Sequence, residues 1–202
     1  VPQETVVTWA HKGKVPAARV NEQWTFDRDR LLAWAAAHGL VLAQGAEAEA
    51  AALPSLFPAL STGGVHIDVP GVCRDEVLSE VVARMPVDPE ERQPLADLLR
   101  ARELAGSTGI GHGIAIPHAI DPLLVSDAQP TVTLCFLRTP VDFDAIDKAP
   151  VSTIFGLVSP SVRVHHHMLA HLSGALRDEQ FRRAMDRHDA AEILEAAHQL
   201  RT

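Results

Sequence analysis

Residues 106–118 read GSTGIGHGIAIPH, and this stretch says more about the fold than any other part of the chain. Its four glycines lie within eight residues, which lets other backbone approach closely and leaves N–H groups able to face an anion. After them, Ile114, Ile116 and His118 alternate at the spacing of a strand. We therefore expect the isoleucines to face the core and His118 to lie at the strand's end, where Pro117 restricts the backbone before it.

The chemistry open to His118 is that of a nucleophile. A neutral imidazole has a free ring nitrogen near pH 7, and histidine is among the side chains that form covalent intermediates. Spacing alone leaves two interpretations open. One is a phosphate-facing loop that ends in a reactive histidine, and the other is a glycine-rich loop beside a partly buried histidine without chemical function.

The sequence after residue 64 predicts an α/β fold, a layered sandwich with a mixed β-sheet flanked by helices. Apolar runs and alternation predict strands at 65–69, 110–116, 132–137 and 154–158. Helical spacing of apolar residues predicts helices at 75–84, 89–103, 164–176, 179–187 and 190–200. Strands interleaved with helices in this way are typical of a layered domain with one sheet.

A second candidate site residue comes from the helix expected at 164–176, which is rich in histidine. At 100° per residue, His165 lies at the centre of the apolar face, in the first turn. The apolar residues within about 60° of it on that wheel are Met168, Leu169, Leu172 and Leu176. At a helix N-terminus the dipole disfavours an imidazolium and favours an anion. The remaining histidines of this helix point to its sides or back and are expected at the surface: His166, His167 and His171.

A metal site is the alternative use of these histidines. Adjacent histidines on a helix diverge, and although His167 and His171 have the i, i+4 spacing that can hold zinc, no HExxH carboxylate accompanies them. We predict no metal and no cofactor. Cys73 and Cys135 show neither metal nor redox spacing and are expected to be small buried residues.

Charge and hydropathy limit the possible settings of this 202-residue chain. Its net charge is -8; residues 1–40 hold five Lys or Arg against four Asp or Glu, and the remainder holds -9. An acidic body does not suit general nucleic-acid binding, although a small segment with local basic residues is compatible with it. No apolar run approaches the roughly 18 residues of a membrane span, and no signal segment opens the sequence. We expect a cytoplasmic protein without membrane insertion.

Composition divides the chain into three parts. Residues 41–58 (VLAQGAEAEAAALPSLFP) are rich in Ala and Glu and predict a linker. Residues 1–40 predict a short helix ended by Gly13, a small hairpin around Asn21, and a second helix that Asp27 caps. Residues 59–202 form the expected α/β domain.

The string STGIGHGIAIPH (107–118) resembles the signature of the mannitol/fructose-type enzyme IIA family of the bacterial sugar phosphotransferase system, which includes nitrogen-regulatory members. The similarity covers roughly residues 60–202 and includes VDFDAID at 141–147. In that family the histidine that ends the motif is phosphorylated. The resemblance therefore implies that His118 accepts a phosphoryl group from an HPr-like phosphocarrier protein. It then passes the group to an EIIB-like acceptor or holds it as a regulatory signal.

The same resemblance assigns the supporting residues. A histidine at the start of a later helix supports the family's site, which implies His165. An arginine four residues before the glycine motif implies that Arg102 neutralises phosphoryl charge, with an ordinary surface arginine as the alternative. The phosphate-binding groups that we expect from the motif belong to Ser107, Thr108, Gly109 and Gly111.

The N-terminal segment is similar to the small winged helix-turn-helix of the excisionase/MerR-like family, through Trp9, Gly13, Pro16, Arg19 and a wing at Trp24 and Phe26. The first helix of that motif would precede Val1, so we expect a partial winged helix-turn-helix. The similarity implies that the full-length protein contacts duplex DNA through Trp9, Lys12, Lys14 and Arg19. It gives an alternative function, a DNA-binding transcriptional regulator whose IIA-like domain only senses phosphorylation.

Overall fold

The computed structural model describes residues 10, 14–20, 23–26, 30, 34, 53–118 and 130–200. The chain divides into two compact units, Val1–Ala52 and Leu53–Thr202.

The first unit contains the hairpin that the sequence predicts. Strands β1 (Ala18–Val20) and β2 (Gln23–Thr25) pair antiparallel, with Val20 opposite Gln23, so that two residues connect them. Lys14 is exposed, whereas of Arg19 only the backbone is described. Trp9 and Lys12 lie outside the described residues, as does most of the two helices expected around the hairpin. The helix-turn-helix therefore stays a prediction.

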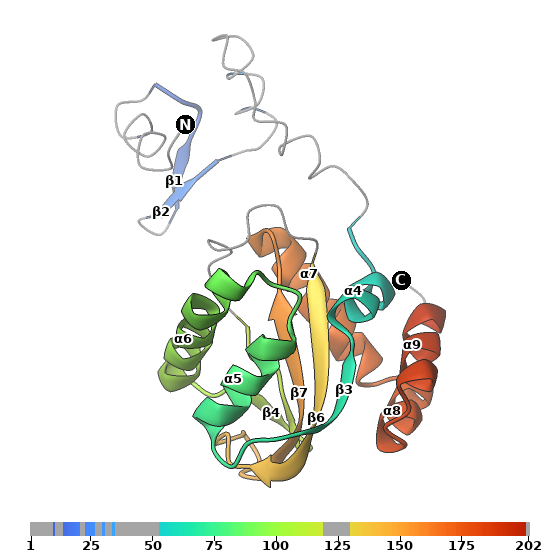
Figure 1. Ribbon diagram of the computed structural model, residues 1–202. Coiled ribbons are helices and arrows are strands. Elements are labelled where there is room, and N and C mark those ends of the chain that lie inside the picture. The colour runs from blue at the N-terminus through green and yellow to red at the C-terminus, as the bar shows by residue number, and fades with distance from the viewer. Residues whose placement is uncertain are drawn as a thin grey trace. The chain divides into compact units, whose positions relative to one another are not determined.

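The second unit is built on a mixed five-stranded sheet, which confirms the predicted fold class (Figure 1). The strand order is β3-β6-β7-β5-β4, with β3 parallel to β6, β5 parallel to β7, and antiparallel pairing of β6 with β7 and of β4 with β5. The strands are β3 (Val65–Val69), β4 (Gly109–Gly111), β5 (Ile114–Ala115), β6 (Thr131–Val141) and β7 (Val151–Val158).

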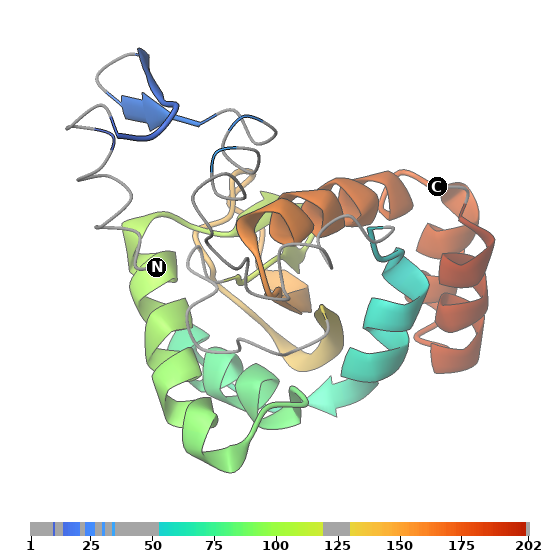
Figure 2. The same ribbon diagram turned by 90° about the horizontal axis from the view of Figure 1, so that it is seen from above.

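Helices cover both faces of this sheet, as the view from above shows (Figure 2). One face packs against α5 (Arg74–Arg84) and α6 (Pro89–Ala105). The other packs against α4 (Leu56–Gly63), α7 (Val162–Ala175), α8 (Glu179–Asp186) and α9 (Ala190–Gln199). Side chains alternate along β6, so that Leu134 and Phe136 join the α7 side and Cys135 joins the α5 side.

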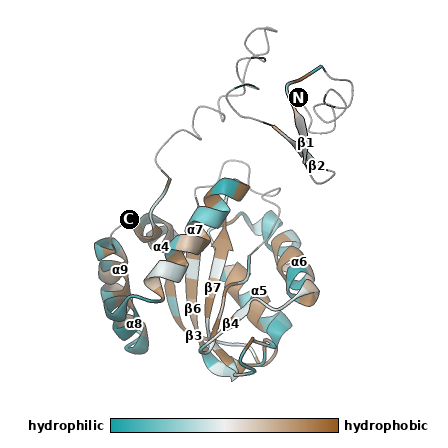
Figure 3. Cartoon of the chain, turned by 180° about the vertical axis from the view of Figure 1, so that it is seen from behind, coloured by the Kyte–Doolittle hydropathy of each residue, from teal (hydrophilic) through white to brown (hydrophobic). Residues whose placement is uncertain are grey.

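The two faces of the sheet hold separate apolar cores. In Figure 3 the central strands are coloured as hydrophobic, while hydrophilic colour dominates the outer sides of α8 and α9. The helix α5 shows the predicted inward residues, because Val77, Leu78, Val81 and Val82 are all buried at helical spacing. Among the helices that the structure describes, none combines the length and the apolar character needed to span a bilayer.

One predicted strand is wrong. The sequence predicts a single strand at 110–116, but the structure has a tight hairpin in which Gly111 pairs with Ile114. The turn residues His112 and Gly113 have φ of 53° and 71°. Two successive positive φ values match the twist of a two-residue hairpin, and glycine adopts them without steric cost. At His112 the backbone N–H donates to Asp147 Oδ2 at 2.8 Å, which holds the less favourable residue of the turn.

The second unit also begins earlier than the predicted boundary. Helix α4 starts at Leu56, within the predicted linker, and Leu56 and Leu60 are fully enclosed in the core. Gly63 at its end lies directly against the backbone of Val132 on β6. These contacts make residues 53–58 part of the domain, because the apolar face of α4 closes the core over β6.

The two cysteines have different surroundings. Cys135 is buried, as expected, and burial raises the pKa of its thiol to about 12. Cys73 is exposed, contrary to the prediction, because it precedes α5 in a surface turn.

Candidate functional site

His118 lies three residues beyond the short strand β5, beside the last part of β7. Its backbone forms a parallel bridge with Leu157, and the carbonyl of the buried Pro117 accepts a hydrogen bond from Leu157 N at 3.1 Å. The ring Nδ1 lies 2.7 Å from Ile116 O. A carbonyl oxygen only accepts, so Nδ1 carries the proton and Nε2 keeps its lone pair. The backbone thus selects the tautomer with a nucleophilic Nε2.

The ionisation of His118 favours the neutral ring. Partial burial lowers its pKa, and the positive charge of Arg102 lowers it further. The hydrogen bond to Ile116 and the carboxylate of Glu103 act in the opposite direction and are outweighed. His118 is therefore unprotonated on Nε2 around neutral pH.

His165 faces His118 from the first turn of α7. The helix begins where the hydroxyl of Ser161 accepts a hydrogen bond from Val164 N at 3.3 Å. The buried face of α7 is the one that the helical wheel predicts. His165 is only 8% exposed, and Met168 and Leu172 are buried on the same face. The centroids of the His118 and His165 rings are 4.9 Å apart. The structure thus brings together the two histidines that the sequence singled out.

The pKa of His165 falls to about 4, chiefly through burial, with smaller contributions from His118 and His166. A neutral imidazole has one N–H donor and one acceptor nitrogen. At pH 7 the two rings therefore meet without charge repulsion, and both remain able to form hydrogen bonds.

Arg102 lies in the last turn of α6, where its Nη1 donates to Gly106 O at 2.7 Å. Its Nε is buried and has no hydrogen-bond partner among the described residues. Its charge acts on the ring of His118. The guanidinium therefore acts electrostatically on His118, and its Nε–H has no acceptor in the described part of the chain.

Three of the four predicted phosphate-binding residues use their polar groups within the protein. Ser107 Oγ donates to Phe143 O at 2.5 Å and accepts from Gly109 N at 2.9 Å. Thr108 donates to the carboxylate of Glu103 through its backbone N–H, at 3.0 and 3.1 Å, and through its hydroxyl, at 2.5 Å. These donors hold the strand in place and do not face His118 freely.

The fourth residue, Gly111, lies away from His118. Ile114 pairs with Thr153 near the start of β7, and His118 pairs with Leu157 four residues further along. At a rise of about 3.3 Å per residue, this places the glycine turn about 13 Å from His118 along the strand. Gly109 allows another segment of the chain to pack closely against it, since a Cβ at this position would lie 2.7 Å from Ala145 Cβ.

Glu103 is a site residue that the sequence analysis missed. Its side chain is 2% exposed, and it accepts three hydrogen bonds from Thr108 alone. Its carboxylate also acts electrostatically on His118. A glutamate near the end of an amphipathic helix is usually exposed, so nothing in the sequence predicts that Glu103 is buried. Its partner, Thr108, meets it only because the chain turns back after α6.

Within the ranges that the structure describes, the other histidines of α7 form no hydrogen bond or ring contact with His118, although the ring of His166 lies 5.8 Å from that of His165 between centroids. His166 is exposed, as predicted. His167 and His171 are half-buried rather than fully at the surface, because His167 Nε2 lies 3.1 Å from Pro54 O and its ring packs on that of His171, at 4.1 Å between centroids. Among the residues described in the structure, no three His, Cys, Asp or Glu side chains are grouped to hold a metal ion.

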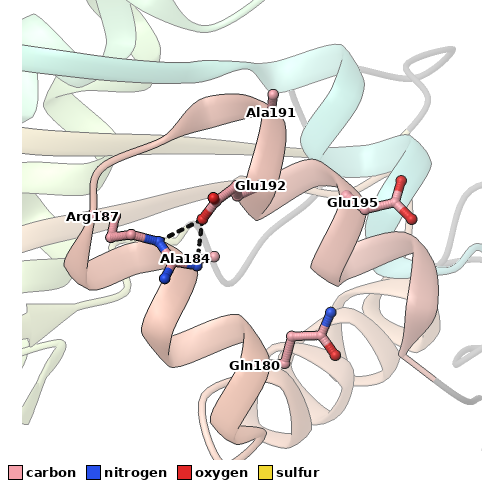
Figure 4. A pocket seen from close by; sticks show the side chains of 6 residues that line it. All are labelled: Gln180, Ala184, Arg187, Ala191, Glu192 and Glu195. Atoms are coloured by element: carbon pink, nitrogen blue, oxygen red, sulfur yellow. Dashed lines mark hydrogen bonds and ion pairs between the residues drawn. The ribbon is translucent and has the colours of Figure 1, made fainter.

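A separate hollow lies between α8 and α9 (Figure 4). An ion pair between Arg187 and Glu192, with 2.5 Å between Nη2 and Oε2, lies across it. Its lining is Gln180, Ala184, Arg187, Ala191, Glu192 and Glu195, none of which the sequence predicts as a site residue.

Comparison with known proteins identifies the family to which this fold belongs. The family described as "Phosphoenolpyruvate-dependent sugar phosphotransferase system, EIIA 2" matches residues 64–199. The chain is 36% identical over 144 residues to a nitrogen regulatory protein of Pseudomonas aeruginosa, a match covering 70% of this chain and 90% of that protein. The family match and the layered α/β domain thus define an enzyme IIA domain of the phosphotransferase system. The chain belongs to the EIIA type 2 family.

Solved structures show the same fold. The nitrogen regulatory protein IIA-Ntr of Neisseria meningitidis matches 67% of this chain and 94% of its own, with a TM-score of 0.56 and 27% identity. The mannitol enzyme IIA of Escherichia coli, solved in complex with phosphorylated mannitol enzyme IIB, matches 68% of this chain and 96% of its own. In that case the TM-score is 0.52 and the identity 20%.

Proposed function

We propose that this protein is a phosphohistidine carrier in which His118 accepts a phosphoryl group on Nε2 from a phosphohistidine of an HPr-like protein. The observation that carries the proposal is the pairing of His118 with a buried, neutral His165, at 4.9 Å between ring centroids. The hydrogen bond from Nδ1 to Ile116 O supports Nε2 as the acceptor atom.

The transfer needs no net movement of a proton. In the donor, a phosphorylated imidazole with a proton on its other nitrogen loses the N–P bond and becomes a neutral ring. In His118, the lone pair of Nε2 forms the new N–P bond, and the ring becomes a phospho-imidazolium that keeps its proton on Nδ1. Ile116 O accepts the hydrogen bond from this N–H before and after transfer. Because the two nitrogens are alike, the protein mainly positions the groups and stabilises the charge on the phosphoryl oxygens.

Three groups supply that stabilisation. The N-terminus of α7 carries backbone N–H groups without partners inside the helix and a partial positive charge. His165 in its first turn donates from the neutral ring, and Arg102 brings a full positive charge. Arg102 and His165 therefore act from two different helices on the same transferring group.

The phosphoryl group then has two destinations. The mannitol enzyme IIA with this fold is found in complex with a phosphorylated enzyme IIB, so an EIIB-like protein is one acceptor. The similarity to a nitrogen regulatory protein favours the other, in which phosphorylated His118 is itself the signal to a regulated partner.

The test is to incubate the protein with a phosphorylated HPr-type carrier protein and to locate the phosphoryl group by intact mass and peptide mapping. We expect one phosphoryl group, on His118, and none in His118→Ala. His166→Ala is the matched control, because His166 is an exposed histidine on the same helix as His165. Undiminished labelling of His118→Ala would disprove the proposal.

A further inference from the structure

Three buried side-chain polar atoms lack a hydrogen-bond partner among the described residues: Arg102 Nε, Thr133 Oγ1 and Ser159 Oγ. Buried polar groups in proteins are nearly always paired, since an unpaired one has lost its water without compensation. Arg102 already belongs to the histidine site. Ser159 had no assigned role from the sequence, and its position raises the question of what its hydroxyl binds.

Ser159 lies where β7 ends and the chain turns into α7. It is two residues beyond Leu157, which pairs with His118, and two residues before Ser161, which caps the helix that carries His165. Leu157 belongs to the core on the α7 side of the sheet and Val158 to the core on the α5 side. By the alternation of β7, which ends at Val158, the next position falls on the α7 side of the sheet, the side of Ile116.

The spacing suits a group held between Ser159 and His118. Neighbouring strands lie about 4.8 Å apart and two residues rise about 6.6 Å, so the two backbones are separated by about 8 Å. This diagonal is long for a direct contact and leaves room for a tetrahedral group on Nε2. Ser159 is 8% exposed, so bulk water does not satisfy its hydroxyl.

We propose that Ser159 is a ligand of the phosphoryl group on His118, donating its hydroxyl hydrogen to a phosphoryl oxygen while Arg102 Nε donates to another. The inference rests on the function proposed above and adds a residue to its site. Ser159 forms no covalent bond and keeps its oxygen–hydrogen bond throughout the transfer. Neither donor has a partner among the described residues of the unphosphorylated protein, and each becomes paired when the phosphoryl group arrives. The site therefore favours the phosphorylated state.

The neighbouring serine does not have this position. Ser161 Oγ already accepts from Val164 N at 3.3 Å as the cap of α7. Thr133 is the better comparison, because its hydroxyl is also buried and has no partner within the described ranges. It lies on β6 opposite Gly156, between Val132 and Leu134, which face the α7 side. Thr133 therefore points to the other face of the sheet, away from His118.

The experiment compares the wild type, Ser159→Ala and Thr133→Val. Each protein is equilibrated with a phosphorylated HPr-type carrier protein, and the equilibrium constant for transfer is measured from the phosphorylated fractions by intact mass. We expect Ser159→Ala to lower this constant about tenfold or more, the size expected for a lost hydrogen bond to a charged group. Thr133→Val should change it less than twofold. Unphosphorylated, both variants should be at least as stable as the wild type in thermal unfolding, since each loses an unpaired buried hydroxyl.

Two results would separate failure of this inference from failure of the proposed function. If His118 is labelled in the wild type and Ser159→Ala reaches the same equilibrium, Ser159 is not a phosphoryl ligand and only this inference falls. If neither the carrier nor phosphoramidate, a small phosphoryl donor with a P–N bond, labels His118 in the wild type, both proposals fall. A clear loss of stability in unphosphorylated Ser159→Ala would also overturn the inference, because it would show that the hydroxyl is already paired.

Discussion

Burial of His165 makes the stability of the second unit depend on pH in a defined window. The pKa of this ring is about 4 in the folded protein and 6.5 in an unfolded chain. Between these values the unfolded chain binds more protons than the folded one, so stability falls as the pH decreases from 6.5 towards 4. The linkage relation gives a loss of about 2 kcal/mol from His165 alone between pH 7 and pH 5.

The assay is urea unfolding of the wild type, His165→Gln and His166→Gln at pH 7 and pH 5. Far-UV circular dichroism is the suitable signal, because the three tryptophans, Trp9, Trp24 and Trp34, all lie in the first unit and the chain has no tyrosine. We expect the wild type and His166→Gln to lose similar stability as the pH falls, because His166 is the smallest of the three causes that lower the pKa of His165. His165→Gln should lose about 2 kcal/mol less, since glutamine does not titrate.

The difference between proteins isolates His165 from the other titrating groups. Burial also lowers the pKa of His118 and of His171, so both add to the loss of stability in the same direction in all three proteins. Equal pH dependence in the wild type and His165→Gln would refute the reasoning, because it would mean that His165 titrates as an exposed histidine does.

Four further outcomes follow from the same structure. The rate of phosphoryl transfer to His118, measured by rapid quench, should stay constant as the pH falls from 8 to below 6.5, because burial lowers the pKa of the ring. A rate that has fallen by half at pH 6.5 or above would contradict this prediction. Arg102→Ala should slow transfer about 10- to 100-fold with little change in the urea midpoint, and an unchanged rate would remove Arg102 from the site. Leu172→Ala should cost about 2–5 kcal/mol in urea unfolding, because Leu172 is fully buried in the core on the α7 side; a cost below about 1 kcal/mol would argue against that packing. Gly63→Ala should lower stability by about 1–3 kcal/mol, since its Cβ would lie 2.3 Å from Val132 O, and a neutral result would show that α4 shifts freely on β6.

The local periodicity of apolar residues was enough to predict which side chains face inward in several helices and strands. The buried face of α5 and the inward position of His165 on α7 depend only on 3.6 residues per turn, so the sequence determines them before any tertiary contact forms. The position of His118 after a short apolar strand follows in the same way from a period of two. The resemblance to enzyme IIA then implied a role for His118 and His165. The family match over residues 64–199 confirmed the family.

Tertiary structure decided which polar groups are available for chemistry. From the sequence, Ser107 and Thr108 have the hydroxyls expected of a phosphate-binding loop. In the structure these hydroxyls donate hydrogen bonds to Phe143 O and to the Glu103 carboxylate. Ser159 stands in no motif, yet its hydroxyl is buried and has no hydrogen-bond partner in the described part of the chain. A donor is free only when no acceptor reaches it, and for Ser107 that acceptor lies 36 residues further along the chain. Periodicity shows which way a side chain points, whereas the partner it meets there depends on how distant segments pack.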